Sequence, residues 1–129
     1  MEDASSVRST AYTVGGGVLE HPADSYAWAT YGLPKPSGIG WQPAGSSGFV
    51  CEVWQSAYGH KARKRTWLFY CGKIEPAPMR WDRKPGTHWI GHYDRKNPGN
   101  FKPGLCAKEA SATPIDFRDA LIALANHSR

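Results

Sequence analysis

The pattern of apolar and polar positions predicts three strands. Residues 49–55 (FVCEVWQ) alternate between two sets of side chains, and residues 66–71 (TWLFYC) form an unbroken β-prone apolar run that Gly72 ends. Alternation indicates a strand with two distinct faces, whereas an unbroken run is typical of a strand buried on both faces. A third strand is predicted at 14–20, within an extended segment from 11 to 20, because its three consecutive glycines weaken a helix.

Two helices are predicted on either side of these strands. Residues 23–31 have helical spacing, and Gly32 suits the C-terminal cap of this helix. The second helix is predicted from Thr113 as N-cap and Pro114 as the first helical residue to about Asn126. Its apolar stripe, which we expect to face the core, consists of Phe117, Leu121, Leu124 and Ala125.

These elements predict an α/β fold, with a small mixed sheet of three or four strands flanked by the two helices. A chain of 129 residues is long enough for one domain with a modest core. Residues 1–9 are polar and are expected to fray. Residues 73–105 contain five prolines and are expected to be irregular, with one short strand at 87–90.

Composition favours a folded cytoplasmic protein without a membrane partner. Hydrophobic residues make up 40% and charged residues 21% of the chain, and no apolar run approaches the ~18 residues of a spanning helix.

The three cysteines are scattered without a C-x-x-C pair, so we expect neither a zinc ribbon nor a disulfide framework. Cys51 and Cys71 lie in apolar stretches and are predicted to be buried. The five histidines are expected to be polar loop residues rather than metal ligands.

Charge is segregated along the chain. Residues 1–59 carry a net charge of −3, residues 106–129 balance, and residues 60–105 hold eleven Lys and Arg against three acidic residues, a net charge of +8. Such a concentration predicts a polyanion such as DNA, or an acidic protein surface, as partner.

Aromatic residues accompany the basic ones, and this combination is typical of nucleic-acid binding because cations bind phosphates and aromatic faces stack on bases. Trp67 lies within the apolar run and is expected to be core. The candidates for phosphate contact are Lys61, Arg63, Lys64, Arg65, Arg83 and Lys84. The candidates for base stacking are Tyr58, Trp81 and Trp89.

Three segments, in order, resemble the later motifs of C5-cytosine DNA methyltransferases of the bacteriophage type. They are residues 18–22 (VLEHP), 58–65 (YGHKARKR) and 110–114 (ASATP). The resemblance implies that the sheet is the later half of a Rossmann-like methyltransferase sheet. It also implies that Glu20, beside His21, lies at a base pocket, and that Arg63 and Arg65 position base and backbone.

The motifs that carry the chemistry of that family are absent from the sequence. The glycines at 15–17 precede a strand instead of following one, so they do not form the cofactor loop. Neither Cys51, Cys71 nor Cys106 follows a proline, so the Pro-Cys nucleophile is also missing. We therefore predict no cofactor and no catalytic residue for this chain alone.

Three functional hypotheses follow. The first is a catalytically incomplete, methyltransferase-derived domain that binds DNA. The second is a small phage or mobile-element protein that binds and inhibits a host defence complex, of the anti-CRISPR or anti-restriction type. The third is one subunit of a split DNA cytosine methyltransferase. Because a half-sheet leaves an open edge, a homodimer or a complementary subunit is also expected.

Overall fold

The computed structural model describes residues 12–14, 17–45, 48–88 and 104–127. A single five-stranded sheet forms its centre, in the order β1-β2-β5-β4-β3. All of its strand pairs are antiparallel. The strands are β1 (Tyr12–Val14), β2 (Val18–Pro22), β3 (Gln42–Pro43), β4 (Gly48–Trp54) and β5 (Arg65–Cys71).

The α/β prediction is confirmed, but the sheet is not mixed. A Rossmann-like sheet is mostly parallel, whereas the sheet in the described residues has antiparallel pairs only. The predicted segment 11–20 is a β1–β2 hairpin in place of one strand, with Val14 paired to Val18. Gly17 lets this hairpin approach β5, because a Cβ at that position would lie 2.5 Å from the Cβ of Cys71.

Both predicted helices are present, the second with a small shift and the first shorter than the predicted range 23–31. α2 (Tyr26–Thr30) is capped by the Ser25 side chain, which accepts from the Ala27 amide, and Gly32 follows it with a φ of 72°. α4 (Ile115–His127) begins one residue later than predicted, and the Pro114 carbonyl accepts its first hydrogen bond from Arg118. Two short helices were not predicted, the 3-10 helix η1 (Gln55–Tyr58) and α3 (Ala107–Ser111).

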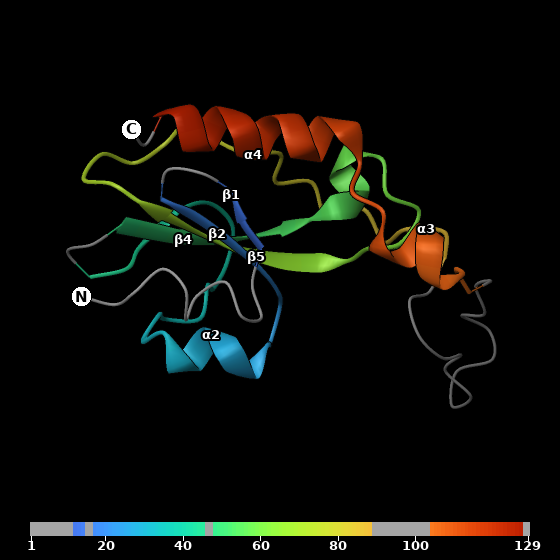
Figure 1. The fold of residues 1–129 in the computed structure, drawn as a ribbon, viewed down its shortest axis with the longest axis horizontal. Coiled ribbons are helices and arrows are strands. Elements are labelled where there is room, and N and C mark those ends of the chain that lie inside the picture. Colours follow the sequence, from blue (N-terminus) through green and yellow to red (C-terminus); the bar gives the residue numbers. More distant parts are fainter. Residues whose placement is uncertain (1–11, 15–16, 46–47, 89–103, 128–129) are drawn as a thin grey trace.

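The sheet lies between the two predicted helices, with α4 on one face and α2 on the other (Figure 1). Phe117 and Leu121 of α4 are almost fully buried, and Phe117 packs on Tyr58 of η1 with ring centroids 5.1 Å apart. All four residues of the predicted α4 stripe belong to the core. The central strand β5 contributes Leu68 and Tyr70 to this face and Trp67 to the other. The prediction that the run at 66–71 is buried on both faces is therefore confirmed for its central part, whereas Cys71 at its end is exposed.

The opposite face is closed by Trp28 of α2. Its indole is 1% exposed, stacks edge-on against Trp67 at 5.4 Å, and donates to the Pro34 carbonyl at 2.8 Å. This one residue anchors a helix that is only five residues long, because a large aromatic side chain buries much apolar area.

The cysteine and loop predictions have mixed outcomes. Cys51 is buried as expected, but Cys71, at the end of β5, is exposed. Residues 73–88 are irregular, as predicted. Within the described part of the predicted strand at 87–90, His88 forms only an isolated bridge with Ala62, and the other half lies outside the described residues.

Replacing Phe117 with alanine should lower the free energy of unfolding by roughly 3–5 kcal/mol, because a buried ring is lost and leaves a cavity. Ile122→Ala on the same helix is the matched control, since Ile122 is 45% exposed, and should change stability by less than about 0.5 kcal/mol. Urea denaturation of both variants measures this, and equal losses would contradict the buried placement of Phe117.

Candidate nucleic-acid interface

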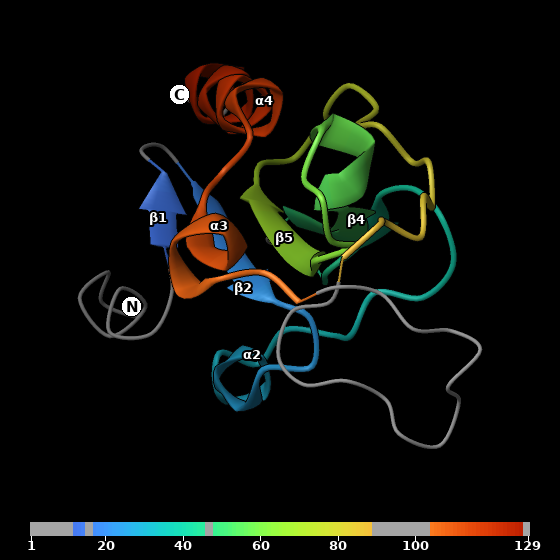
Figure 2. The same cartoon turned by 90° about the vertical axis from the view of Figure 1, so that its right-hand side faces the viewer.

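An open cavity of about 730 Å³ lies beside α3, near the residues that begin β5 and end β4. Figure 2 looks toward this end of the sheet, with α3 in front of β2 and β5. We call this cavity the basic groove. Its lining comes from distant segments of the chain: Pro22, Ala23, Trp54, Ala62, Arg63, Lys64, Arg65, Pro85, His88, Ala107, Ala110 and Ser111.

The backbone of residues 61–65, which we call the basic segment, is held in place from both sides. On one side, the amides of Gln55 and Ser56 in η1 donate to the carbonyls of Lys64 and Arg63, at 3.3 and 3.4 Å. On the other side, the segment at 85–88 approaches so closely that a Cβ on Gly86 would lie 2.7 Å from the Arg63 nitrogen. Gly86 also has a φ of 79°, which glycine adopts without strain. The groove wall is therefore built on fixed backbone.

A buried carboxylate, Glu52, organises the side chains at the groove. Its cross-strand neighbour is Trp67, whose indole N–H donates to it at 2.9 Å, and the Trp54 indole donates at 2.7 Å. Arg65 donates through Nε and Nη2, at 2.9 and 3.0 Å. Burial by itself would raise the pKa of Glu52, but the hydrogen bonds from Arg65, Trp67 and Trp54 outweigh it and lower that pKa to about 2. Glu52 is therefore an anion at neutral pH.

Two of the residues predicted to contact phosphate, Arg65 and Arg83, already bind other groups of this protein. Arg65 is shared between Glu52 and Asp24, the latter at 3.1 Å. Arg83 donates to Glu52 at 3.3 Å and to the Gly38 carbonyl at 3.0 Å. These guanidinium groups hold the structure together, and a ligand would have to compete for them.

Trp54 was not among the predicted site residues. The guanidinium carbon of Arg63 lies 5.0 Å from the centre of the Trp54 ring and that of Arg83 lies 5.3 Å from it, within the range of cation–π contact. The only sequence signal was its position two residues after Glu52, on the same face of an alternating strand. Arg63 itself is exposed and has no carboxylate partner among the described residues.

The predicted lysines fall into two groups. Lys64 lines the groove, donates to the Ala112 carbonyl at 3.4 Å and has a φ of 44°, in the left-handed region. Lys61 and Lys84 are exposed and do not line the groove, and Lys61 forms an ion pair with Glu109 at 3.1 Å. The free cations at the groove are therefore Arg63 and Lys64.

Glu20 and His21 do not form one pocket, because neighbouring residues of a strand point to opposite faces of the sheet. Glu20 accepts from Gln55 at 3.4 Å; burial raises its pKa and the nearby Lys64 charge opposes that rise. His21 is buried on the α2 face against Trp28, and burial lowers its pKa. Neither His21 ring nitrogen has a hydrogen-bond partner in the described part of the chain.

Two of the predicted stacking residues, Tyr58 and Trp81, pack inside the protein and do not line the groove. Tyr58 is 6% exposed, and its hydroxyl accepts the Arg80 amide at 2.8 Å. Trp81 is half-buried and packs edge-on against Trp41, with centroids 6.2 Å apart. Trp89 lies outside the described residues. The aromatic residue at the groove is instead Trp54.

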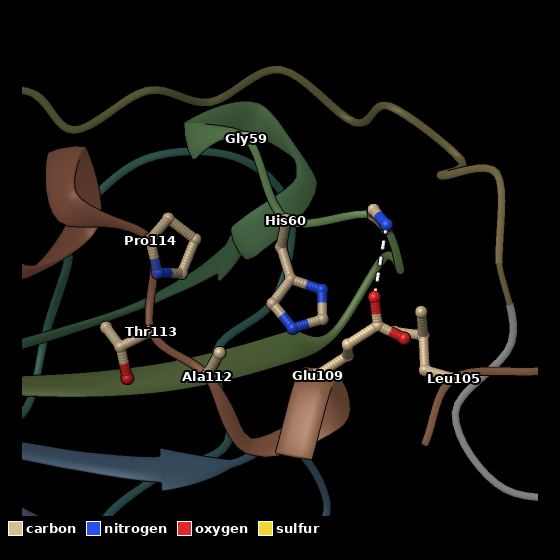
Figure 3. A pocket seen from close by; sticks show the side chains of 8 residues that line it. Gly59, His60, Leu105, Glu109, Ala112, Thr113 and Pro114 are labelled. Carbon is tan, nitrogen blue, oxygen red and sulfur yellow. Dashed lines mark hydrogen bonds and ion pairs between the residues drawn. The ribbon is translucent and has the colours of Figure 1, made fainter. Parts of the chain in front are cut away.

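A second cavity of about 210 Å³ lies between the loop after η1 and α3 (Figure 3). His60 is buried beside it; its Nδ1 accepts from the Ala62 amide at 3.0 Å and its Nε2 faces the Ala110 carbonyl at 3.3 Å. His60 thus ties this loop to α3, and burial lowers its pKa. The Lys61–Glu109 ion pair crosses the same cavity, so its charges are already paired.

Arg65→Ala should lower the free energy of unfolding by about 1.5–3 kcal/mol, because it removes charged hydrogen bonds and leaves Glu52 less satisfied. The neighbouring Arg63→Ala, which removes an exposed side chain from Trp54, should cost less than about 1 kcal/mol. Chemical denaturation of the two variants distinguishes the structural role of Arg65 from the surface position of Arg63. If Arg63→Ala proves the more damaging change, the assignment of these two arginines is reversed.

Glu52→Gln should be less stable than the wild type at neutral pH, and this difference should shrink as pH falls from about 4.5 towards 2. A carboxyl whose folded pKa is lowered stabilises the fold above its unfolded pKa, and this stabilisation is lost on protonation. Urea midpoints measured across this pH range test it, with the exposed Glu75→Gln as control. A difference between wild type and Glu52→Gln that stays constant with pH would contradict the ionised network.

Comparisons with known proteins found no match to a family model, a curated protein or a solved structure, so the functional proposal depends on the geometry of the groove. Among the described residues, no helix is long and apolar enough to cross a membrane, and no group of three metal-ligating side chains comes together.

Proposed function

We propose that this chain binds nucleic acid through the basic groove, with Arg63 and Lys64 contacting phosphates. The observation that carries the proposal is that these two cations line one open cavity and that neither forms an ion pair within the described residues. A cation that is already neutralised by a carboxylate gains little free energy from binding a phosphate. An unpaired cation displaces the counterions of the nucleic acid when it binds, and their release favours binding.

The conformation of Lys64 also supports this proposal. A left-handed backbone costs a residue with a Cβ roughly 1–2 kcal/mol, and glycine would adopt it without that cost. Its ammonium group has one weak hydrogen bond, at 3.4 Å to the Ala112 carbonyl; burial lowers its pKa, and the nearby Glu20 carboxylate opposes that fall. The Lys64 carbonyl accepts hydrogen bonds from the Gln55 amide and the Thr66 hydroxyl, which help to hold this backbone conformation. Strained conformations of this kind cluster at ligand sites.

Descent from a methyltransferase is a separate proposal, and nucleic-acid binding does not depend on it. The order of the three motifs in the sequence supports descent. The antiparallel sheet is unlike the Rossmann-like half-sheet that the resemblance implies. We therefore assign this chain a binding role and derive no methyl-transfer step from the geometry.

In fluorescence anisotropy with labelled DNA, affinity should fall steeply with salt. Arg63→Ala and Lys64→Gly should each weaken binding and reduce the slope of log affinity against log salt by about 1, since each removes one phosphate contact. Lys64→Gly suits the test because glycine tolerates the left-handed backbone.

The matched control is Lys73→Ala, which removes an exposed lysine beyond the opposite end of β5. Its affinity and salt slope should equal those of the wild type. If the wild type shows no binding at low salt, or if Lys73→Ala weakens binding as much as Arg63→Ala does, the groove is not a nucleic-acid site. The alternative partner for its cations is then an acidic protein surface.

A further inference from the structure

The shape of the basic groove restricts what form of nucleic acid can enter it. Sequence readout of duplex DNA uses a protruding helix or β-ribbon inserted into the major groove. The site here is the reverse, a concave cavity whose walls come from the β2–α2 turn, the end of β4, residues 62–65, residues 85–88 and α3. Its volume of about 730 Å³ falls within the range of about 300–1,000 Å³ typical of pockets that enclose a small ligand.

The groove also presents a cationic and aromatic surface. The guanidinium carbon of Arg63 lies over the Trp54 ring, 5.0 Å from its centre, and the Arg63 side chain is exposed. Planar guanidinium groups and indole rings are the surfaces on which unpaired bases stack. In a duplex the faces of the bases are already covered by their neighbours.

The Trp54 ring of this stacking surface is held in position by Glu52. The Trp54 indole is held by its 2.7 Å hydrogen bond to Glu52, and the same carboxylate holds Arg83 near the ring. Few rotamers of Trp54 and Arg83 therefore remain to be ordered on binding, and preformed parts of a site lose less entropy when a ligand arrives.

Resting on the function proposed above, we infer that the ligand of the basic groove is a single-stranded nucleic acid. One unpaired base stacks on the Arg63–Trp54 pair, and the charges of Arg63 and Lys64 contact the adjoining phosphates. Phosphate attraction brings the strand to the groove, and the stacked base distinguishes it from a duplex.

The test compares three labelled probes of equal length: a single strand of deoxythymidine, a duplex, and a single strand that is abasic at every position but keeps its phosphates. The single strand should bind at least about 10-fold more tightly than either of the others, given the contribution of one stacked base. Trp54→Leu should remove most of this preference. The control for a lost aromatic residue is Tyr26→Leu, which removes a side chain 95% exposed on α2.

Arg63→Lys is a second variant, which we expect to fold as the wild type does. It keeps the charge of an exposed residue and removes only the planar guanidinium group. It should keep the salt slope of the wild type and lose affinity for the deoxythymidine strand about 10-fold, with little change for the abasic strand. If the duplex or the abasic strand binds as tightly as the deoxythymidine strand, the single-strand inference is overturned while nucleic-acid binding stands. If none of the three probes binds at low salt, the proposed function fails as well.

Discussion

The carboxylate of Glu52 adds a buried polar link between β4, β5 and the irregular segment after β5, which also meet through apolar contacts. It accepts N–H groups from Trp54 on its own strand, from Trp67 and Arg65 on the neighbouring strand, and from Arg83 in the irregular segment. A buried ionised carboxylate is costly unless its oxygens are satisfied. Here five donated hydrogen bonds satisfy them. The residues at the end of β4 and the start of β5 consequently have defined positions.

The same network separates the basic residues into two kinds. Arg65 and Arg83 neutralise Glu52 and fix the walls of the groove. Arg63 and Lys64, two residues and one residue before Arg65, remain available at its surface. Alternation along an extended chain, interrupted by the left-handed conformation of Lys64, sends neighbouring side chains in different directions. A cluster that looks uniform in sequence thus has structural and ligand-facing members.

Each wall of the groove is held by a polar tie that involves distant residues. His60 bridges the loop after η1 to α3 through the Ala110 carbonyl. Gly86 lets the 85–88 segment lie against the backbone of residues 61–63, where the Lys61 carbonyl accepts the amides of Thr87 and His88. Such ties link residues up to fifty positions apart, and they place aromatic, cationic and small residues around one cavity.

The sequence by itself determined the long strands, the two main helices and the α4 core stripe, because these depend on local periodicity, capping residues and apolar runs. It also located the basic segment. Only the tertiary structure decided the antiparallel strand order, the pairing of Arg65 with Glu52, the burial of Tyr58, and the placement of Trp54 at the groove. Strand direction and ion-pair partners depend on residues far apart in the chain. No local pattern in 58–65 distinguishes an arginine that neutralises a buried carboxylate from one that faces solvent.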